Sequence, residues 1–189
     1  MKKAKIQATA PESVVYLASV GVARPEGSAT LPAKLVRLLG QFDLARLAQG
    51  QPVPIKMHLG GGLGYSTIHP LLVRTVVKAV QAAGGKPFVV DSALRTVAAA
   101  AERGYTAETL GCPIVAAGGP YDRYVVDRDI GFRQLDKAGV YGAIWHAPAL
   151  INLSHVKGHG ACAYGGACKN IAMGCVDAAT RSKIHALEG

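Results

Sequence analysis

The sequence predicts an α/β fold in three layers, with a mainly parallel sheet covered by helices on both faces. Short apolar runs rich in β-branched residues alternate with longer segments of helical periodicity, which is the pattern of βαβ units. Half of the 189 residues are hydrophobic and only 17% are charged, so the chain can bury a substantial core and is not disordered. We therefore expect one α/β domain over residues 1–189, with residues 1–13 loose.

Five apolar runs are predicted to form strands, because each is short, continuous and bounded by glycine, proline or polar residues. These strands cover residues 14–20, 52–58, 87–91, 113–117 and 149–153. A connector over residues 21–30 follows the first strand, and residues 118–139 are less regular and are expected to form a hairpin.

Helices are predicted where apolar residues recur at helical spacing or where cap signals stand. Pro70 lies in the first turn of one such helix, Gly84 and Gly85 end it, and Ser92 is a candidate cap for the next. The predicted helices cover residues 31–47 (as one helix or two), 68–83, 93–103, 141–147, 166–173 and 178–187.

Polar side chains stand at the ends of three predicted strands. His58 and Asp91 end their strands, and His155 closely follows the last one. In open parallel sheets, ligands bind beyond the carboxyl ends of the strands. We therefore expect these three segments to meet at one crevice.

The segment 152–170 concentrates histidines, lysines, cysteines and glycines. His155, Lys157 and His159 alternate with other residues, so in an extended segment they point the same way. Neutral imidazoles bind nickel, zinc or iron, and an ammonium group attracts an anion. The segment is therefore predicted to hold a metal ion, an anion or both; the alternative is a solvated surface loop.

Two glycine-rich turns are candidate anion sites. Gly165 and Gly166 lead into a helix that carries Lys169 and Asn170, and free N–H groups at a helix start attract anions. The connector 60–64 is followed by Ser66 and Thr67, which could cradle a phosphate or carboxylate. It lacks the P-loop and GxGxxG patterns, so nucleotide binding is not indicated, and a plain structural turn is the alternative.

Three cysteines, Cys162, Cys168 and Cys175, could hold a soft metal or an iron–sulfur cluster, although their spacing matches neither a zinc ribbon nor a bacterial ferredoxin. For Cys175 and Cys112 the alternative is a small buried thiol. Thiols beside a site, rather than in a disulfide framework, favour a cytoplasmic location.

The formal net charge is +9, but the basic residues are scattered and aromatic residues make up only 6%. A nucleic-acid groove with stacking platforms is therefore not indicated, and no apolar run reaches the roughly 18 residues that a membrane span needs. We expect a small anionic molecule as the partner.

Three blocks of the sequence resemble a known family: IKMHLGGGLGYSTIHP, GGKPFVVDS, and ALINLSHVKGHGACAYGGACKNIAMGC with a later His185. They are similar to the domain of unknown function 362 family, uncharacterised Fe–S centre proteins, over roughly residues 31–187. Members commonly continue into a ferredoxin-like segment with cysteines for [4Fe–4S] clusters, and this chain ends before it. Cys175 matches the family pattern, whereas Cys162 and Cys168 fall where members more often carry apolar residues. The resemblance implies a ferredoxin-type electron-transfer partner.

A more distant resemblance is to nickel-pincer lactate racemases, which carry a His, a Gly-Gly-x-Lys turn and another His. The separations here are 169 − 159 = 10 and 185 − 169 = 16 residues, similar to that family. The resemblance implies His159 as a proton-transfer residue, Lys169 as the cofactor tether and His185 as a metal ligand. The second acid/base histidine is absent, since that stretch reads Ser92-Ala-Leu-Arg95.

These observations predict a metal- or cofactor-dependent redox or proton-transfer protein, either an oxidoreductase or a racemase-like enzyme, that acts on a small anionic substrate. His159, Lys169 and Lys157 are the candidate catalytic residues. The candidate ligands of a nickel, iron or zinc ion, or of an Fe–S cluster, are His185, His155, His58, Cys162, Cys168 and Cys175. The alternative is a non-catalytic iron–sulfur electron-transfer or scaffold module; a basic nucleic-acid binder rests on the charge alone.

Overall fold

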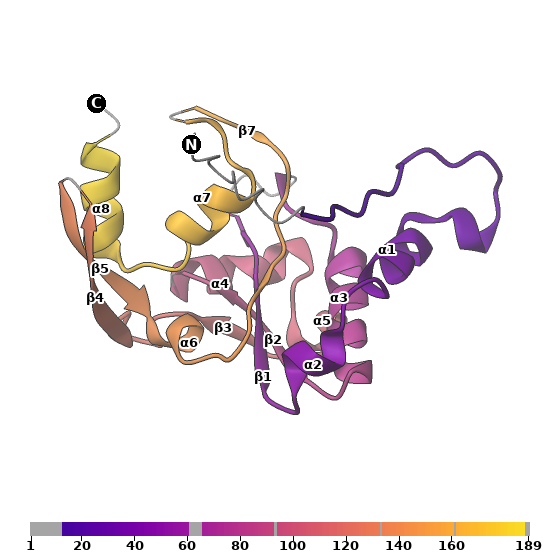
Figure 1. The fold of residues 1–189 in the computed structure, drawn as a ribbon, viewed down its shortest axis with the longest axis horizontal. Helices are drawn as coiled ribbons and strands as arrows, with labels where there is room; N and C mark the ends of the chain where they lie inside the picture. Colours follow the sequence, from indigo (N-terminus) through magenta and orange to yellow (C-terminus); the bar gives the residue numbers. More distant parts are fainter. Residues whose placement is uncertain (1–12, 61–65, 93, 133, 161, 188–189) are drawn as a thin grey trace, which may run out of the picture.

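A four-stranded sheet forms the centre of the protein (Figure 1), seen in a computed structural model that describes residues 13–60, 66–92, 94–132, 134–160 and 162–187. The strand order is β3-β2-β1-β6, and every neighbouring pair is parallel. These strands are β1 (Pro52–Lys56), β2 (Lys86–Asp91), β3 (Ile114–Ala116) and β6 (Ile151–Asn152).

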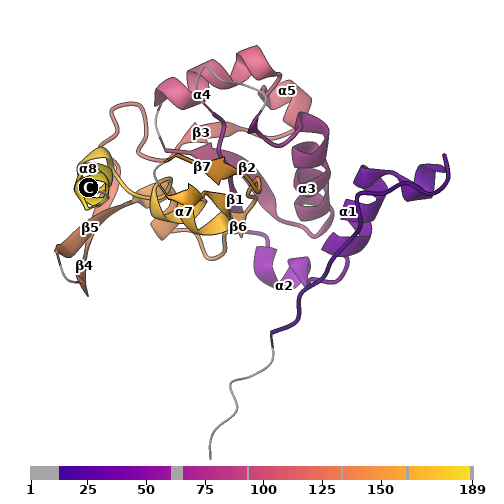
Figure 2. The ribbon, with the colours of Figure 1, turned by 90° about the horizontal axis from the view of Figure 1, so that it is seen from above.

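Helices cover both faces of this sheet, which confirms the predicted three-layer α/β arrangement (Figure 2). One face packs against α1 (Leu31–Leu39), α2 (Leu44–Ala48), α3 (Pro70–Ala82), α4 (Leu94–Ala100) and α5 (Ala107–Leu110). On the other side lie α6 (Gly142–Trp145), α7 (Gly166–Ala172) and a hairpin of β4 (Val125–Phe132) and β5 (Leu135–Tyr141), against which α8 (Ala178–Ala186) packs.

The alternation of side chains along β2 shows why the sheet needs two covering layers. Val89 packs in the large core with α3, whereas Phe88 and Val90 pack on the other side with Tyr141 of the hairpin. Successive strand residues point to opposite faces, and both sets here are apolar. A continuous apolar strand is therefore stable only when both faces are buried, as in parallel sheets generally.

The connections bring the carboxyl ends of the strands to one edge. β1 leads through α3 into β2, which pairs with it from Pro52↔Lys86 to Lys56↔Val90. His69 caps α3 because its Nδ1 accepts the N–H of Leu71 at 3.2 Å, as expected for a residue at a helix start. β6 pairs only with the last residues of β1, so the segment that follows β6 leaves the sheet beside His58.

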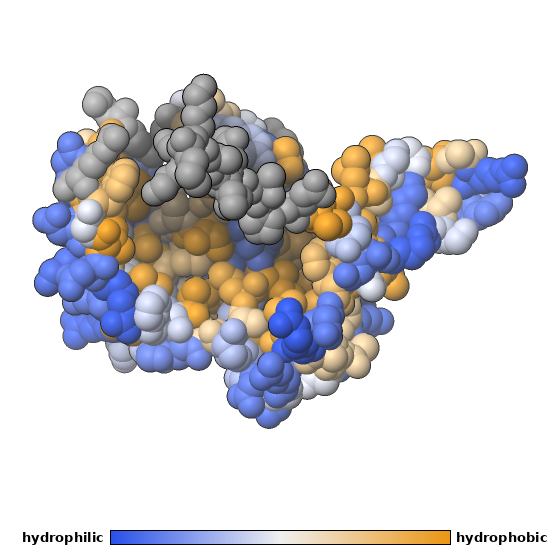
Figure 3. Space-filling model, viewed as in Figure 1, coloured by the Kyte–Doolittle hydropathy of each residue, from blue (hydrophilic) through white to orange (hydrophobic). Residues whose placement is uncertain are grey.

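The predicted strand over residues 14–20 is wrong. The segment is extended but is not assigned to any strand, and Val15 and Leu17 are 84% and 92% exposed. It is held beside α1 by Lys34, whose ammonium donates to the carbonyls of Ser19 and Gly21. Figure 3 shows hydrophobic and hydrophilic residues mixed on the protruding right-hand part of the molecule, which carries this segment and α1. β-propensity describes how a residue fits a sheet, and here no neighbouring strand offers a ladder to these residues.

The other predicted elements are found within a few residues of their expected bounds, and the hairpin over 118–139 is confirmed as β4 and β5. The sequence analysis missed α5, the 3₁₀ turn η1 (Gly27–Ala29) and the hairpin of β7 (Gly158–His159) and β8 (Ala163–Tyr164), and the predicted helix over residues 93–103 is divided into α4 and the 3₁₀ turn η3 (Ala101–Arg103). The predicted connector 60–64 lies outside the described residues apart from Gly60. None of the helices in the described part is both long and apolar enough to cross a bilayer.

Candidate functional site

A cavity of about 590 Å³ opens at the carboxyl ends of β1 and β2. Its walls come from the strand ends, from α4, from the segment after β6 and from α7. Eight predicted site residues line it together: His58, His155, Lys157, His159, Gly165, Gly166, Lys169 and Asn170. The expected meeting of separate segments at one crevice therefore occurs at the sheet edge where ligands bind in parallel α/β folds.

The local backbone aims these side chains at the cavity. His155, Lys157 and His159 line it in alternation, as an extended segment requires. Gly166, Lys169, Asn170 and Met173 line it from α7, and a spacing of three, four and seven residues marks a single helix face.

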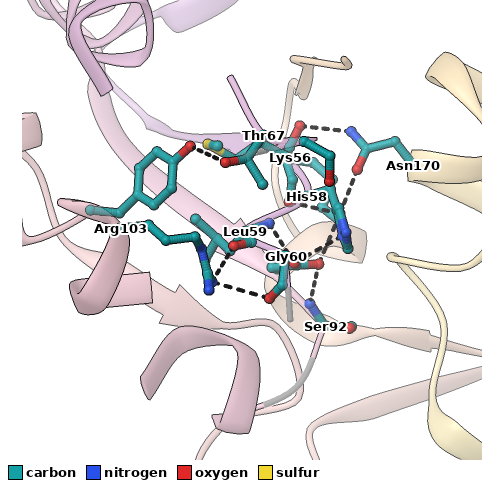
Figure 4. Close-up of polar contacts among 12 residues, drawn as sticks. Lys56, His58, Leu59, Gly60, Thr67, Ser92, Arg103 and Asn170 are labelled. Atoms are coloured by element: carbon teal, nitrogen blue, oxygen red, sulfur yellow. Dashed lines mark hydrogen bonds and ion pairs between the residues drawn. The ribbon is translucent and has the colours of Figure 1, made fainter. Parts of the chain in front are cut away.

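Lys56 is buried beneath this cavity with only 1% of its surface exposed. Its Nζ donates to the carbonyl of Met57 at 3.0 Å and to Asn170 Oδ1 at 2.7 Å, and lies 3.0 Å from Asp91 Oδ1. An ammonium group has three N–H donors, so each has an acceptor (Figure 4). The burial of this charge is thus fully compensated.

Asp91 neutralises Lys56 and fixes the turns that follow the strands. Its Oδ2 accepts the N–H of Leu59 at 2.9 Å, its Oδ1 accepts the N–H of Ser92 at 2.7 Å, and it is 3% exposed. Nearby, Arg103 donates to the carbonyls of Leu59 and Gly60 (Figure 4). The carboxylate is therefore occupied by the protein itself.

Asn170 ties α7 to the strand ends. Its amide donates to the carbonyl of Lys56 at 3.0 Å and to Asn152 Oδ1 at 2.7 Å. Gly174, one turn later, allows this close approach, because a Cβ there would collide with Lys56 Nζ and Cε. The face of α7 that carries Lys169 is thus anchored by buried hydrogen bonds.

His58 sits at the cavity wall with its Nδ1 3.9 Å from Asp91 Oδ2. Burial lowers the pKa of His58 below its ordinary value of 6.5; Asp91 opposes this shift, and Lys157, Lys56 and Arg103 add to it. Because burial and three cations outweigh one carboxylate, the ring is neutral at pH 7 and can serve as a hydrogen-bonding group.

The two lysines of the central segment are held differently. Lys157 donates to the carbonyl of Ser66 at 2.9 Å, and burial lowers its pKa, partly opposed by Asp91. Lys169 Nζ lies 3.4 Å from His159 Nδ1 and 3.7 Å from Cys162 Sγ. Neither lysine forms an ion pair with a described carboxylate, so both leave positive charge in the cavity.

His155 contributes a buried ring atom. Its Nδ1 has no hydrogen-bond partner among the described residues, although the ring lines the cavity. A buried polar atom without a partner costs roughly 1–3 kcal/mol. Because Nδ1 is closed to solvent, it is other atoms of the ring that line the cavity.

The other predicted site residues lie apart from this group. His185 is exposed on α8 and is not among the residues lining the cavity. The hydroxyl of Tyr105 donates a hydrogen bond to Thr67 Oγ1 at 2.7 Å. Ser66 accepts the hydrogen bond of Lys157 with its backbone carbonyl rather than with its hydroxyl. Cys175 is buried and burial raises its pKa, whereas Cys168 is exposed. Cys112 is buried as well, so the small-thiol alternative fits both buried cysteines.

The predicted metal ligands do not gather. Within the described ranges no three His, Cys, Asp or Glu side chains stand close enough together to hold a metal ion. The cavity offers imidazoles beside ammonium groups instead, and nearby ammonium charge repels a metal cation. The described side chains therefore suit an anion better than a bare metal ion.

Sequence reasoning missed several residues of the cavity, among them Lys56, Arg95, Met173 and Gly174. Lys56 carried a usable signal, because a lysine inside an apolar parallel strand must be buried and paired. Arg95 carried none, since an arginine in the first turn of a helix is ordinarily solvated.

The sequence profile of the family described as Domain of unknown function (DUF362) matches residues 53–189. The chain therefore belongs to this family. The match begins within β1 and includes every segment that lines the cavity. No curated protein and no solved structure shows a significant match.

Proposed function

We propose that this protein binds a small anionic substrate in the cavity and transfers a proton to or from it through His159 and Lys169. The observation that supports this best is the pair itself, with Lys169 Nζ 3.4 Å from His159 Nδ1 at the wall of the cavity. An ammonium group beside an imidazole is a general acid–base arrangement, and the 3.4 Å between the two nitrogens is slightly longer than the roughly 2.6–3.2 Å of a catalytic hydrogen bond, as is common before a substrate binds.

Substrate binding in this proposal depends on the uncompensated lysines. Lys157 and Lys169 face the cavity without a described carboxylate partner, and Asp91, the only carboxylate among the described residues that line it, is already paired with Lys56. Partial burial strengthens the attraction of an ammonium group for a carboxylate compared with the same pair in water. The neutral His58 would add a hydrogen bond to the bound molecule.

We assign no metal ion to this reaction, because the described His and Cys side chains do not form a set of metal ligands. We place the protein in the cytoplasm, since its four cysteines are free and two of them are exposed, as in a reducing compartment. The ferredoxin-type partner and the iron–sulfur module stay predictions.

The test follows deuterium from D₂O into small carboxylic acids by NMR, with glycolate, lactate and malate as probes. We expect exchange at the carbon that bears the carboxylate. His159→Asn and Lys169→Gln should lower the exchange rate by about 10² or more, the contribution typical of a general acid or base.

Two controls make this test specific. Lys78→Gln removes one positive charge from the exposed side of α3 and should leave the rate within about twofold, because exposed surface charges away from a site contribute little. Lys157→Gln should raise the substrate concentration for half-maximal rate more than it lowers the maximal rate. If none of the probes exchanges, or if His159→Asn and Lys78→Gln behave alike, the proposed proton transfer is wrong.

A further inference from the structure

The charged groups of the cavity do not cancel. Five charged side chains line it among the described residues: Lys56, Asp91, Arg95, Lys157 and Lys169. Lys56 and Asp91 form a buried ion pair at 3.0 Å and neutralise one another. Three cations remain, and none forms an ion pair with a described carboxylate. A ligand with a single carboxylate would neutralise one of these three positive charges and leave the other two unbalanced.

Arg95 lies on a different wall from the two lysines. It comes from α4, where Ala99 also lines the cavity, and a spacing of four residues places both on one helix face. The lysines come from the segment after β6 and from α7. A guanidinium group presents a planar fork of donors that matches a carboxylate or phosphate in two parallel hydrogen bonds.

The volume of the cavity also exceeds the need of a three-carbon acid. Ligand sites of roughly 300–1,000 Å³ hold drug-sized molecules, and this cavity measures about 590 Å³. Ala99 and Met173 supply apolar wall between the charged groups. The ring of His155 also lines the cavity.

We infer that the cavity takes a small dianion, a molecule with two anionic groups joined by a short carbon chain, and that Arg95 holds the second group. This inference rests on the proposed function and specifies its substrate class: a dicarboxylate or a phosphorylated carboxylic acid. One anionic group lies with Lys157 and Lys169 next to His159. The other lies at Arg95, which makes Arg95 the residue that selects dianions over monoanions.

Titration calorimetry at pH 7 and low salt tests this with three probes: succinate, 2-phosphoglycolate and butyrate. Whichever of the two dianions binds more tightly should bind the unmodified protein with at least tenfold higher affinity than butyrate. Arg95→Gln should lower the affinity for that dianion by about tenfold or more, which corresponds to about 1.4 kcal/mol, and should change the affinity for butyrate less than twofold. Arg74→Gln, on the exposed side of α3, is the matched control and should change neither.

The other outcomes distinguish the two classes of dianion and show which part of the inference is wrong when the expected result is not obtained. Tighter binding of 2-phosphoglycolate identifies a phosphorylated acid, and tighter binding of succinate identifies a dicarboxylate. Equal weakening of all three probes by Arg95→Gln, or dianions that bind no better than butyrate, would overturn the inference. If butyrate binding then still depends on Lys169, only the role of Arg95 fails. If no probe binds to the unmodified protein, the proposed function fails with it.

Discussion

The buried pair of Lys56 and Asp91 gives the sharpest prediction about how the site is built. In Lys56→Met, the side chain keeps its length but loses the ammonium group that meets Asp91 Oδ1 at 3.0 Å. Asp91, which is 3% exposed, is left as a buried carboxylate without its cation. Among the described residues, only the N–H groups of Leu59 and Ser92 remain as its hydrogen-bond donors.

The size of the effect follows from this burial. Removing one partner of a buried ion pair typically costs about 3–5 kcal/mol, because the remaining charge stays in a medium of low polarity. Asn170 Oδ1 also loses a donor at 2.7 Å, so we place Lys56→Met at the upper end of that range. Domain stabilities are only about 5–15 kcal/mol, so the midpoint of urea unfolding should fall steeply.

Urea unfolding at pH 7, followed by circular dichroism, measures this loss. The matched control is Lys137→Met, which breaks the ion pair with Asp129 at 3.6 Å, where both side chains are more than two-thirds exposed. Exposed pairs contribute about 0–1 kcal/mol. Adding Asp91→Asn to Lys56→Met removes the stranded charge and should recover part of the loss. A loss below about 1 kcal/mol, or a double variant that shows simple additivity, would refute this account.

Two further predictions concern the same wall of the cavity. Gly174→Ala should destabilise the protein by about 1–3 kcal/mol, because its Cβ would overlap Lys56 Nζ and Cε. The control is Gly27→Ala, because a Cβ at Gly27 would have no atom within 4 Å. Urea unfolding measures both variants, and an equal loss of stability in the two would contradict the steric argument. Burial lowers the pKa of His58 below 6.5, so the unfolded chain takes up its proton first and stability must fall as the pH drops below 6.5. His58→Gln should therefore lose less stability than the unmodified protein between pH 7 and pH 5, and parallel pH profiles would show that His58 is not the cause.

The layers of the fold and the end of the sheet at which the cavity opens could both be predicted from the sequence, because both follow from rules about parallel sheets. His58, Asp91 and His155 were predicted to meet from their positions at strand ends alone, and the cavity brings them together. The same reasoning failed at residues 14–20, because an apolar run carries no information about whether another strand will pair with it.

The position of His185 shows a different limit. The resemblance to lactate racemases implied a shared site for His185 and Lys169, but α8 packs on the hairpin rather than over the cavity. Contacts far apart in sequence direct it there: the N–H of Gly139 donates to Thr180 Oγ1 at 2.9 Å, and Arg181 donates to the hydroxyl of Tyr141 at 3.2 Å. Local patterns could not reveal these long-range contacts.

The stability of the fold and the proposed function are coupled through one helix, α7. Asn170 is fixed by Lys56 and Asn152, so the preceding residue, Lys169, is directed toward His159 by the helical backbone. Lys56 contributes no free charge to the cavity because Asp91 neutralises it. If Lys56→Met still folds, it should nevertheless weaken butyrate binding, because the face of α7 that presents Lys169 loses its anchor. The buried pair thus acts as a positioning device, and in the proposed function the charge that attracts the substrate belongs to Lys169, which this pair positions.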